Sequence, residues 1–307
     1  MAVFWILLCL FLILLGGSYY AYRFTFFVSK KDRAKKPDFS SHKYDACRDT
    51  IDHLYGAIQE RPCEEVTISS FDGLTLFGRY YHVRDGAPLD IGFHGYRSSA
   101  MTDFAGGSEL SLSMGHNLLL IDERAHGRSD GHTIAFGVQE RWDVVSWVRY
   151  AVQRFGPETK ILLYGVSMGA ATVLMASGLE LPGNVKGIIA DCPYSSPKAI
   201  IRKVARDMHL PDRLMWPLVK IGARVFGGFD IDAADAEQAV KQAKVPILIL
   251  LGVSVGFVPC EMSDLVSANP CLITRQTFPG ADHAFSYLSD TPRYRQIVTE
   301  FAERVLQ

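Results

Sequence analysis

The sequence predicts an α/β protein with a mostly parallel central sheet, helices on both faces of that sheet, a helical lid insertion and one preceding transmembrane helix. Three observations carry this prediction. Short apolar runs alternate with helical stretches along most of the 307 residues. The chain opens on a long uncharged segment. One Gly-x-Ser-x-Gly pentapeptide, at residues 165–169, stands directly between a strand-like run and a helical run.

The N-terminal segment is long enough to cross a membrane. Residues 2–22 are 21 residues without a charge, and a helix needs about 20 to span the hydrocarbon core. We therefore predict a transmembrane anchor over residues 1–28. A cleaved secretory signal is the alternative, but the segment lacks a basic start and a small-residue cleavage site. Five basic residues within 30–36 favour a cytoplasmic domain after the span and can contact anionic headgroups.

Residues 29–41 are predicted to form a basic linker and residues 42–307 a single domain. Between 44 and 58, apolar residues recur every three or four positions, which indicates an amphipathic helix packed on the domain. Two β-rich runs, residues 66–68 and 74–81, then flank an Asp72-Gly73 turn. This is the pattern of an antiparallel hairpin.

Six further runs share the apolar, β-rich composition of buried strands, at residues 89–93, 117–121, 160–164, 185–190, 246–251 and 273–278. Helical stretches such as residues 139–154 separate them, so we expect these strands to be mainly parallel. Ligands of such sheets bind beyond the carboxyl ends of the strands. Polar residues that follow these strands are therefore the candidates for a functional site.

Composition argues against several classes of function. The net charge is −1 and the basic residues beyond the juxtamembrane cluster are dispersed, so we expect no nucleic-acid partner. Five of the six cysteines lie outside the anchor without paired spacing, which does not indicate a disulfide framework. The nine histidines are scattered and no Cys-x-x-Cys occurs, so no metal and no cofactor are expected.

Three pentapeptides fit Gly-x-Ser-x-Gly, and their flanks distinguish them. A serine nucleophile on an α/β sheet needs a strand that runs into a sharp turn and then into a helix. Ser167 has both flanks, because residues 160–164 are strand-like and residues 170–176 are helix-like. A glycine-rich stretch follows Ser129, and a proline delays any helix after Ser254, so both serines are expected in loops.

Several motifs follow one another in an order that resembles the α/β-hydrolase superfamily. They are His94-Gly95-Tyr96, residues 122–129, Gly165-Val166-Ser167-Met168-Gly169, residues 190–195 and Gly280-Ala281-Asp282-His283. The resemblance covers nearly everything after the linker. Within the superfamily, the chain resembles the bacterial membrane-anchored serine hydrolases related to the serine aminopeptidase and prolyl-oligopeptidase branch.

Acyl transfer needs a nucleophile, a base and donors for the oxyanion of the transition state. Ser167 is the predicted nucleophile, and the elbow geometry makes the backbone N–H of Met168 the first oxyanion donor. The resemblance implies the amide of Tyr96 as the second donor. We interpret His94 as a ring that stabilises the turn, in preference to the alternative of a direct catalytic role. The resemblance also implies a histidine base in a loop after the last strand, where His283 fits.

The acid of the triad is missing from its usual place. The resemblance calls for an aspartate after the seventh strand, where this chain has Val255, and a valine side chain cannot accept a hydrogen bond. A relocated acid is one explanation, since Asp191 ends the sixth strand, from which some lipases of this fold supply the carboxylate. Asp282 is a poor substitute, because it directly precedes His283. The other explanation is a degenerate member that keeps its pocket for binding.

Residues 193–244 leave the strand and helix alternation and carry apolar side chains at helical spacing. We predict a helical lid that caps the pocket and selects an apolar acyl or aromatic group; alternatively, these side chains only pack on the domain. Pro211, Pro217 and the Gly227-Gly228 pair are expected to divide the insertion into short helices.

The sequence thus predicts a membrane-anchored hydrolase of carboxylic esters or related acyl compounds that works through Ser167 and His283. The expected partners are a small-molecule ester, acyl or peptide substrate and the membrane. The alternative is a catalytically impaired protein that binds a hydrophobic ligand or partner.

Overall fold

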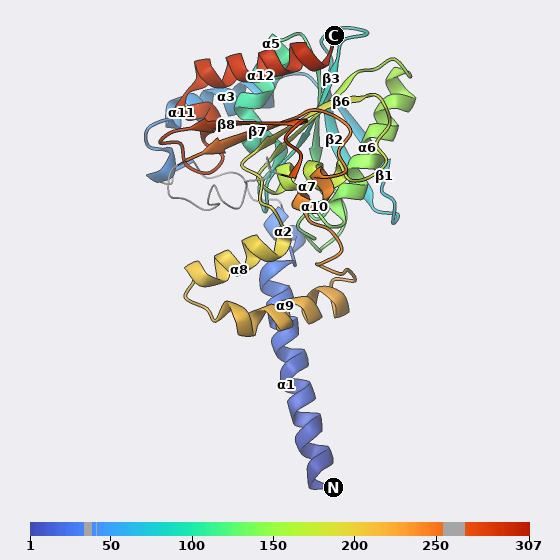
Figure 1. Ribbon diagram of the computed structural model, residues 1–307, viewed down its shortest axis with the longest axis vertical. Coiled ribbons are helices and arrows are strands. Elements are labelled where there is room, and N and C mark those ends of the chain that lie inside the picture. Colours follow the sequence, from blue (N-terminus) through green and yellow to red (C-terminus); the bar gives the residue numbers. More distant parts are fainter. Residues whose placement is uncertain (34–38, 41, 254–267) are drawn as a thin grey trace.

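A computed structural model describes the chain except for residues 34–38, 41 and 254–267 (Figure 1). The described strands form one sheet in the order β1-β2-β4-β3-β5-β6-β7-β8. Their bounds are β1 Glu64–Ser69, β2 Thr75–Tyr81, β3 Leu89–Phe93, β4 Asn117–Asp122, β5 Ile161–Val166, β6 Val185–Asp191, β7 Ile247–Gly252 and β8 Ile273–Phe278. The β1–β2 hairpin is antiparallel. The next six strands in the sheet, β4, β3, β5, β6, β7 and β8, are parallel to one another. The predicted hairpin and the six predicted strands are confirmed.

Helices cover both faces of the sheet. The helices that pack around the sheet are α3 Arg48–Glu60, α4 Ala100–Asp103, α5 Ala105–Ser113, α6 Glu140–Phe155, α7 Met168–Ala176, α10 Ala236–Val240, α11 Ser286–Ser289 and α12 Thr291–Val305. Alternate residues of a strand face opposite sides. In β4, Leu119 packs in the core on the α6, α7 and α10 face, whereas Leu118 and Leu120 pack in the core on the α3, α5 and α12 face.

The first helix, α1 Ala2–Thr25, is part of the domain at its C-terminal end. Tyr22 and Phe26 are buried in the larger core. The chain after α1 then pairs with residues 132–134, since Ile134 N–H donates to Phe26 O at 2.8 Å and Val28 N–H donates to His132 O at 2.9 Å. The N-terminal part of α1 projects away from the domain (Figure 1). A separate anchor over residues 1–28 stays a prediction, but the packing of its last turns was not expected. The short helix α2 Lys30–Arg33 and a 3₁₀ turn at His42–Tyr44 follow.

The insertion after β6 forms two helices, α8 Pro197–Asp207 and α9 Asp212–Val225. They lie below the sheet beside α1 (Figure 1). Pro211 separates them as predicted, but the predicted break at Pro217 is wrong, because this residue lies inside α9. A proline there removes one backbone hydrogen bond at a cost of about 3 kcal/mol. Packing of α9 across α1 offsets that cost: a Cβ on Gly222 would lie only 2.6 Å from Ser18 O.

Candidate active site

Ser167 occupies a sharp turn between β5 and α7, with φ 55° and ψ −109°. Such a backbone is strained by about 1–3 kcal/mol and persists where the surroundings enforce it. The flanking glycines show that enforcement. A Cβ on Gly165 would lie 2.3 Å from Gly169 O, and a Cβ on Gly169 would lie 2.0 Å from Phe93 O. The predicted strand, turn and helix context of Ser167 is therefore present, and only glycine fits on both sides.

His283 lies against this serine. Its Nε2 atom is 2.8 Å from Ser167 Oγ, within the range for proton transfer between a base and a hydroxyl. The loop after β8 carries the histidine, and its backbone N–H donates to the carboxylate of the neighbouring Asp282 at 2.9 Å. Both Ser167 and His283 are half-buried. The structure thus brings together two residues that are 116 positions apart in the chain.

The loop after β3 passes directly beside the serine. A Cβ on Gly95 would lie 3.3 Å from Ser167 Cβ, and the Gly95 N–H donates to Asp103 Oδ2 at 2.6 Å. Arg97 has a left-handed backbone, with φ 53°, and its N–H donates to His126 Nε2 at 3.0 Å. Tyr96 lies between these two fixed points. Its main chain is therefore held at the edge of the site.

Two buried histidines support this loop. His94 Nε2 accepts the Glu123 N–H at 3.1 Å, and His94 Nδ1 lies 2.9 Å from Gly95 O. The His94 and His126 rings meet edge to face at 4.7 Å. Burial, together with His94, holds the pKa of His126 well below its usual value, so His126 is the neutral acceptor that Arg97 requires. His94 has the turn-stabilising surroundings that the sequence indicates.

Asp191 ends β6 in the same pocket, and its carboxylate is buried. Tyr294 Oη donates to Asp191 Oδ2 at 2.8 Å, whereas Ser286 Oγ reaches Oδ1 only at 3.4 Å. Burial raises the pKa of Asp191 to about 6, and the hydrogen bond from Tyr294 opposes that rise. Among the described residues, these hydrogen bonds tie Asp191 to α11 and α12. The loop position Val255 lies outside the described residues.

Two cavities meet at Ser167. One of about 280 Å³ is lined by Ser167, Tyr96, Asp191, His283 and polar residues of the α4 loop. The other has about 520 Å³, a typical volume for a small-molecule site, and is mainly apolar. It shares Ser167 and Tyr96 with the first cavity, and its remaining wall comes mainly from α1, α8, α9 and the α8–α9 connection, with Arg97, Phe136 and Tyr194 from loops of the domain. Residues of α8 and α9 thus line the apolar cavity at Ser167, and their action as a lid stays a prediction.

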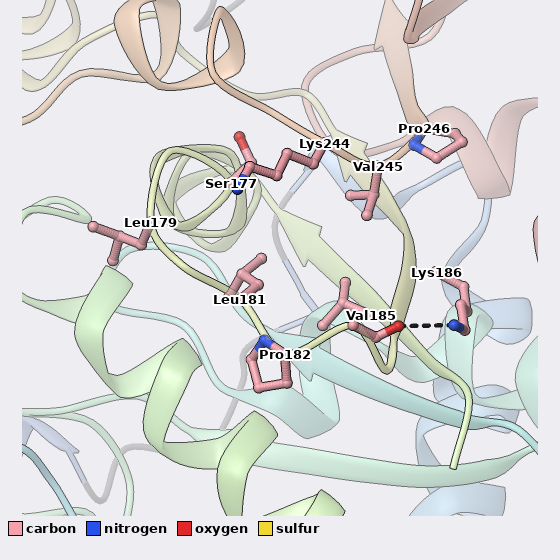
Figure 2. Close-up of a pocket in the computed structure, with 10 residues that line it drawn as sticks. Ser177, Leu179, Leu181, Pro182, Val185, Lys186, Lys244, Val245 and Pro246 are labelled. Carbon is pink, nitrogen blue, oxygen red and sulfur yellow. Dashed lines mark hydrogen bonds between the residues drawn. The ribbon is translucent and has the colours of Figure 1, made fainter. Parts of the chain in front are cut away.

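Figure 2 shows a cavity of about 400 Å³ at the opposite end of the sheet, around Ser177, Leu181 and Val185. It lies at the amino ends of β6 and β7. Ligands of open α/β sheets bind at the carboxyl ends of the strands. This cavity also holds none of the residues predicted for chemistry, so we assign it no function.

The other serine pentapeptides do not form an elbow in the described part of the chain. Ser129 is buried, accepts the Phe77 N–H at 2.9 Å and donates to Asp122 O, which is the turn role expected. Ser254 lies outside the described residues. Within the ranges that the structure describes, no group of three or more His, Cys, Asp or Glu side chains could hold a metal ion.

Sequence reasoning missed the residues that hold the site from a distance. Tyr294 and Ser286 bind Asp191, Asp103 fixes Gly95, and the last turns of α1 wall the apolar cavity. No motif marks them. These residues come from α1, α4, α11 and α12, and only the three-dimensional packing of these helices brings them to the site.

Comparisons with known proteins agree with this architecture. A family model described as alpha/beta hydrolase fold matches residues 93–245. The chain is 26% identical over 204 residues to YqkD of Bacillus subtilis, an uncharacterized protein. It is also 26% identical over 207 residues to the thiohydrolase aneE of Aspergillus aculeatus. These alignments cover 64% of this chain in each case, and 65% and 58% of the two relatives.

Solved structures show the same fold. The esterase Pf2001 of Pyrococcus furiosus superposes with a TM-score of 0.67 at 21% identity, over 82% of this chain and 94% of the esterase. An α/β hydrolase of Vibrio vulnificus gives a TM-score of 0.62 at 19% identity, over 92% and 91% of the two chains. The chain therefore belongs to the α/β-hydrolase superfamily. Its resemblance to one branch of membrane-anchored serine hydrolases stays a prediction.

Proposed function

We propose that this protein is a serine hydrolase of carboxylic esters or related acyl compounds, with Ser167 as nucleophile and His283 as general base. The observation that carries the proposal is the 2.8 Å contact between Ser167 Oγ and His283 Nε2 at the strained turn after β5. A nucleophile and a base within hydrogen-bond reach are the common requirement of such enzymes. Superfamily membership and the esterase and thiohydrolase neighbours support a hydrolase.

In the reaction that we propose, Ser167 Oγ attacks the acyl carbon while His283 Nε2 takes its proton. The tetrahedral oxyanion collapses, the acyl–oxygen bond to the leaving group breaks, and His283 returns the proton to the departing alcohol. Water then attacks the acyl-serine with His283 again as base. This second step releases the carboxylic acid and restores the Ser167 hydroxyl, so no further reactant is required.

The backbone amides of Met168 and Tyr96 are the proposed oxyanion donors. Met168 is the first residue of α7, so its N–H has no partner within the helix and lies at the positive end of the helix dipole. Tyr96 belongs to the loop that Asp103 and His126 hold beside Ser167. Preorganised amide donors of this kind contribute about 10²–10³ in kcat each.

Asp191 is the proposed acid. Its Oδ2 atom is engaged by Tyr294 at 2.8 Å, but the 3.4 Å contact of Oδ1 with Ser286 is too long for a strong hydrogen bond. Oδ1 is therefore the oxygen that would accept a hydrogen bond from His283 Nδ1–H and stabilise the imidazolium when it forms. Loss of the acid in a serine triad lowers kcat by about 10⁴.

The two cavities suggest how a substrate lies. The apolar cavity of about 520 Å³ would take the acyl group, and the smaller cavity beside Asp103 and His283 would take the leaving group. The relative named as a thiohydrolase extends the candidate substrates from oxygen esters to thioesters.

We also propose that α1 spans a membrane and that the domain lies on its cytoplasmic side. The helix has 24 residues with a mean hydropathy of 2.3 in its best window, and only 6% of that window is buried. The basic residues that follow it support the orientation.

A catalytically impaired ligand-binding protein is the second candidate. One observation favours it, namely Val255 in the loop where the superfamily resemblance calls for an aspartate. The 2.8 Å contact between Ser167 and His283 favours the enzyme instead.

Hydrolysis of 4-nitrophenyl butanoate by the full chain in detergent tests the proposal. We expect turnover in the parent and in Ser69→Ala, which changes an exposed serine of β1. Ser167→Ala should lower kcat by about 10³-fold or more. Equal, background-level rates for parent and Ser167→Ala would overturn the enzyme and leave the binding protein.

A further inference from the structure

The free part of α1 is shorter than a membrane. The helix packs against α9 from about residue 17, since a Cβ on Gly17 would lie 3.5 Å from Leu218, and the Tyr19 and Phe226 rings meet at 5.2 Å. Residues 2–17 are 16 residues and extend about 24 Å at 1.5 Å per residue. The hydrocarbon core is about 30 Å thick. A spanning α1 therefore brings its crossing with α9 to the edge of the hydrocarbon.

The outer surface of α8 and α9 has the composition expected at the edge of the hydrocarbon. Four large apolar side chains of α8, α9 and their connection are exposed: Met208 by 46%, Leu210 by 39%, Leu214 by 74% and Val225 by 57%. Exposed basic residues lie among them, at Arg206, Arg213, Lys220 and Arg224. Exposed apolar side chains beside Lys and Arg are typical of a helix that lies in a membrane interface. Tyr19 and Tyr20 lie in α1 at the level where interfacial aromatic residues gather.

The apolar cavity leads from this surface to the serine. The exposed residues of its lining mark its mouth: the large side chains of Tyr20 by 68%, Phe24 by 51%, Met208 and Leu210, together with Arg97. Its inner wall is buried and includes Ala21, Phe136, Tyr194 and Val219, and Ser167 lies at its end. The mouth thus opens between α1 and the connection of α8 to α9, at the height of the bilayer surface.

Hydrogen bonds hold α1 in place as a wall of this cavity. Tyr96 Oη donates to Thr25 O at 2.7 Å, and Arg97 Nη2 donates to Phe24 O at 3.0 Å. Both donors belong to the loop beside Ser167. The end of the membrane helix is therefore fixed to the proposed oxyanion loop, and it cannot act as a loose tether.

We propose that the cavity takes one long acyl chain of a membrane-embedded ester directly from the bilayer, between α1 and the lid, and presents its carbonyl to Ser167. This inference rests on the proposed function and names its substrate class. The lining supports an alkyl chain, because it is mainly aliphatic and aromatic and continues the exposed apolar face of α1. A lipid-phase chain is already desolvated, so it enters without crossing water.

Binding can be measured without catalysis. The Ser167→Ala protein, reconstituted in phosphatidylcholine vesicles, is titrated with a fluorescent fatty acid of 16 to 18 carbons. We expect saturable binding that Ala205→Trp weakens at least about tenfold, because the indole fills the cavity at α8. Ala57→Trp is the matched control, since Ala57 is exposed on α3. Equal affinity in the two tryptophan variants would overturn the inference.

Chain-length preference gives the catalytic readout. We compare kcat/KM for 4-nitrophenyl dodecanoate with kcat/KM for the butanoate, both in vesicles. Ala205→Trp, and separately Leu210→Glu at the mouth, should lower this ratio at least about tenfold relative to Ala57→Trp and Ala57→Glu. An unchanged ratio in both cavity variants would contradict the inference while leaving the hydrolase intact. Absence of all ester turnover, with fatty-acid binding retained, would instead remove the proposed function.

Membrane contact by α9 separates bilayer access from capture out of solution. Leu214→Glu places a charge on the most exposed apolar residue of the lid. It should slow hydrolysis of vesicle-embedded dodecanoate relative to butanoate dissolved in water, whereas Ala57→Glu should not. Equal slowing of both substrates, or of neither, would contradict entry from the bilayer. A stable dimer that buries Leu214 would do the same.

Discussion

Tyr294 Oη donates a 2.8 Å hydrogen bond to Asp191 Oδ2, which ties the last helix to the end of β6 in the pocket of Ser167, the proposed nucleophile. The bond stabilises the ionised carboxylate in surroundings that otherwise disfavour it, because burial raises the pKa of Asp191 to about 6. The charge state of the proposed acid therefore depends on its burial and on a tyrosine that no motif identifies.

Removing that tyrosine hydroxyl should shift the pH dependence of activity. If Asp191 must be ionised, kcat/KM falls as the pH drops through about 6. Tyr294→Phe removes a group that lowers this pKa, so the acidic limb should move to higher pH. The profile of kcat/KM for 4-nitrophenyl butanoate checks this. Tyr287→Phe is the control, because Tyr287 bonds Glu109 instead, and identical shifts in both variants would refute the prediction.

Replacing the acid itself should be costly. Asp191→Asn keeps the size of the side chain but removes its charge, so the imidazolium of His283 loses its proposed counter-ion. We expect kcat to fall by about 10²–10⁴ with little change in KM. A wild-type kcat would place the acid elsewhere. Val255→Asp then tests the usual acid position, because it introduces the aspartate that the superfamily resemblance calls for. An unchanged kcat would mean that the protein already has a working acid elsewhere. A rise in kcat would mean that the triad of the parent protein is disabled.

Gly169, two residues after the proposed nucleophile Ser167, should not tolerate a methyl group. A Cβ on Gly169 would lie 2.0 Å from Phe93 O, so Gly169→Ala must displace β3 or the elbow. We expect loss of ester hydrolysis and a lower melting temperature. Gly56→Ala in α3 is the control, where nothing lies within 4 Å and the change should stabilise the helix by about 1 kcal/mol. Similar effects of both substitutions would show that the steric argument fails.

A buried glutamate should make stability depend on pH. Burial, together with Glu140 and Asp143, raises the pKa of Glu123 well above the ordinary value of a glutamate. Its carboxyl oxygens have no hydrogen-bond partner among the described residues. The folded protein therefore binds this proton more tightly than the unfolded chain does. Protonated Glu123 contributes fully to the free energy of unfolding below about pH 4.5, and this contribution is lost as the pH rises.

Glu123→Gln, which cannot ionise, should consequently gain stability over the parent as the pH increases from 5 to 8. The difference can grow by at most about 1.4 kcal/mol per pH unit. Chemical unfolding in detergent across this range measures it, with the exposed Glu60→Gln as control. A constant difference between parent and Glu123→Gln would mean that Glu123 is not the group responsible.

Local pattern was sufficient for most of the sheet. The strands and the turn at Ser167 can be predicted because apolar runs, an Asp-Gly turn and paired glycines each favour one backbone conformation. Gly165 and Gly169 are the clearest example of such a pair. Pro217 was misjudged, since its cost is offset by the packing of α9 on α1, which has no local signal. The same holds for Tyr294, which lies 103 residues from Asp191 in the chain.

The helix α1 shows most clearly what could not be predicted from the sequence alone. Uncharged composition predicts a span, but it does not reveal that Tyr20 and Phe24 wall a cavity that ends at Ser167. That relationship depends on how α9 crosses the helix at Gly222.

Covalent labelling of the nucleophile tests the central claim most directly. The full chain, reconstituted in vesicles, is treated with a fluorophosphonate, and the intact mass and the modified peptide are determined. We predict one adduct on Ser167, formed at a rate that His283→Ala lowers at least about a hundredfold. No adduct, or an adduct on another serine, would contradict the assignment of Ser167 and His283 as nucleophile and base.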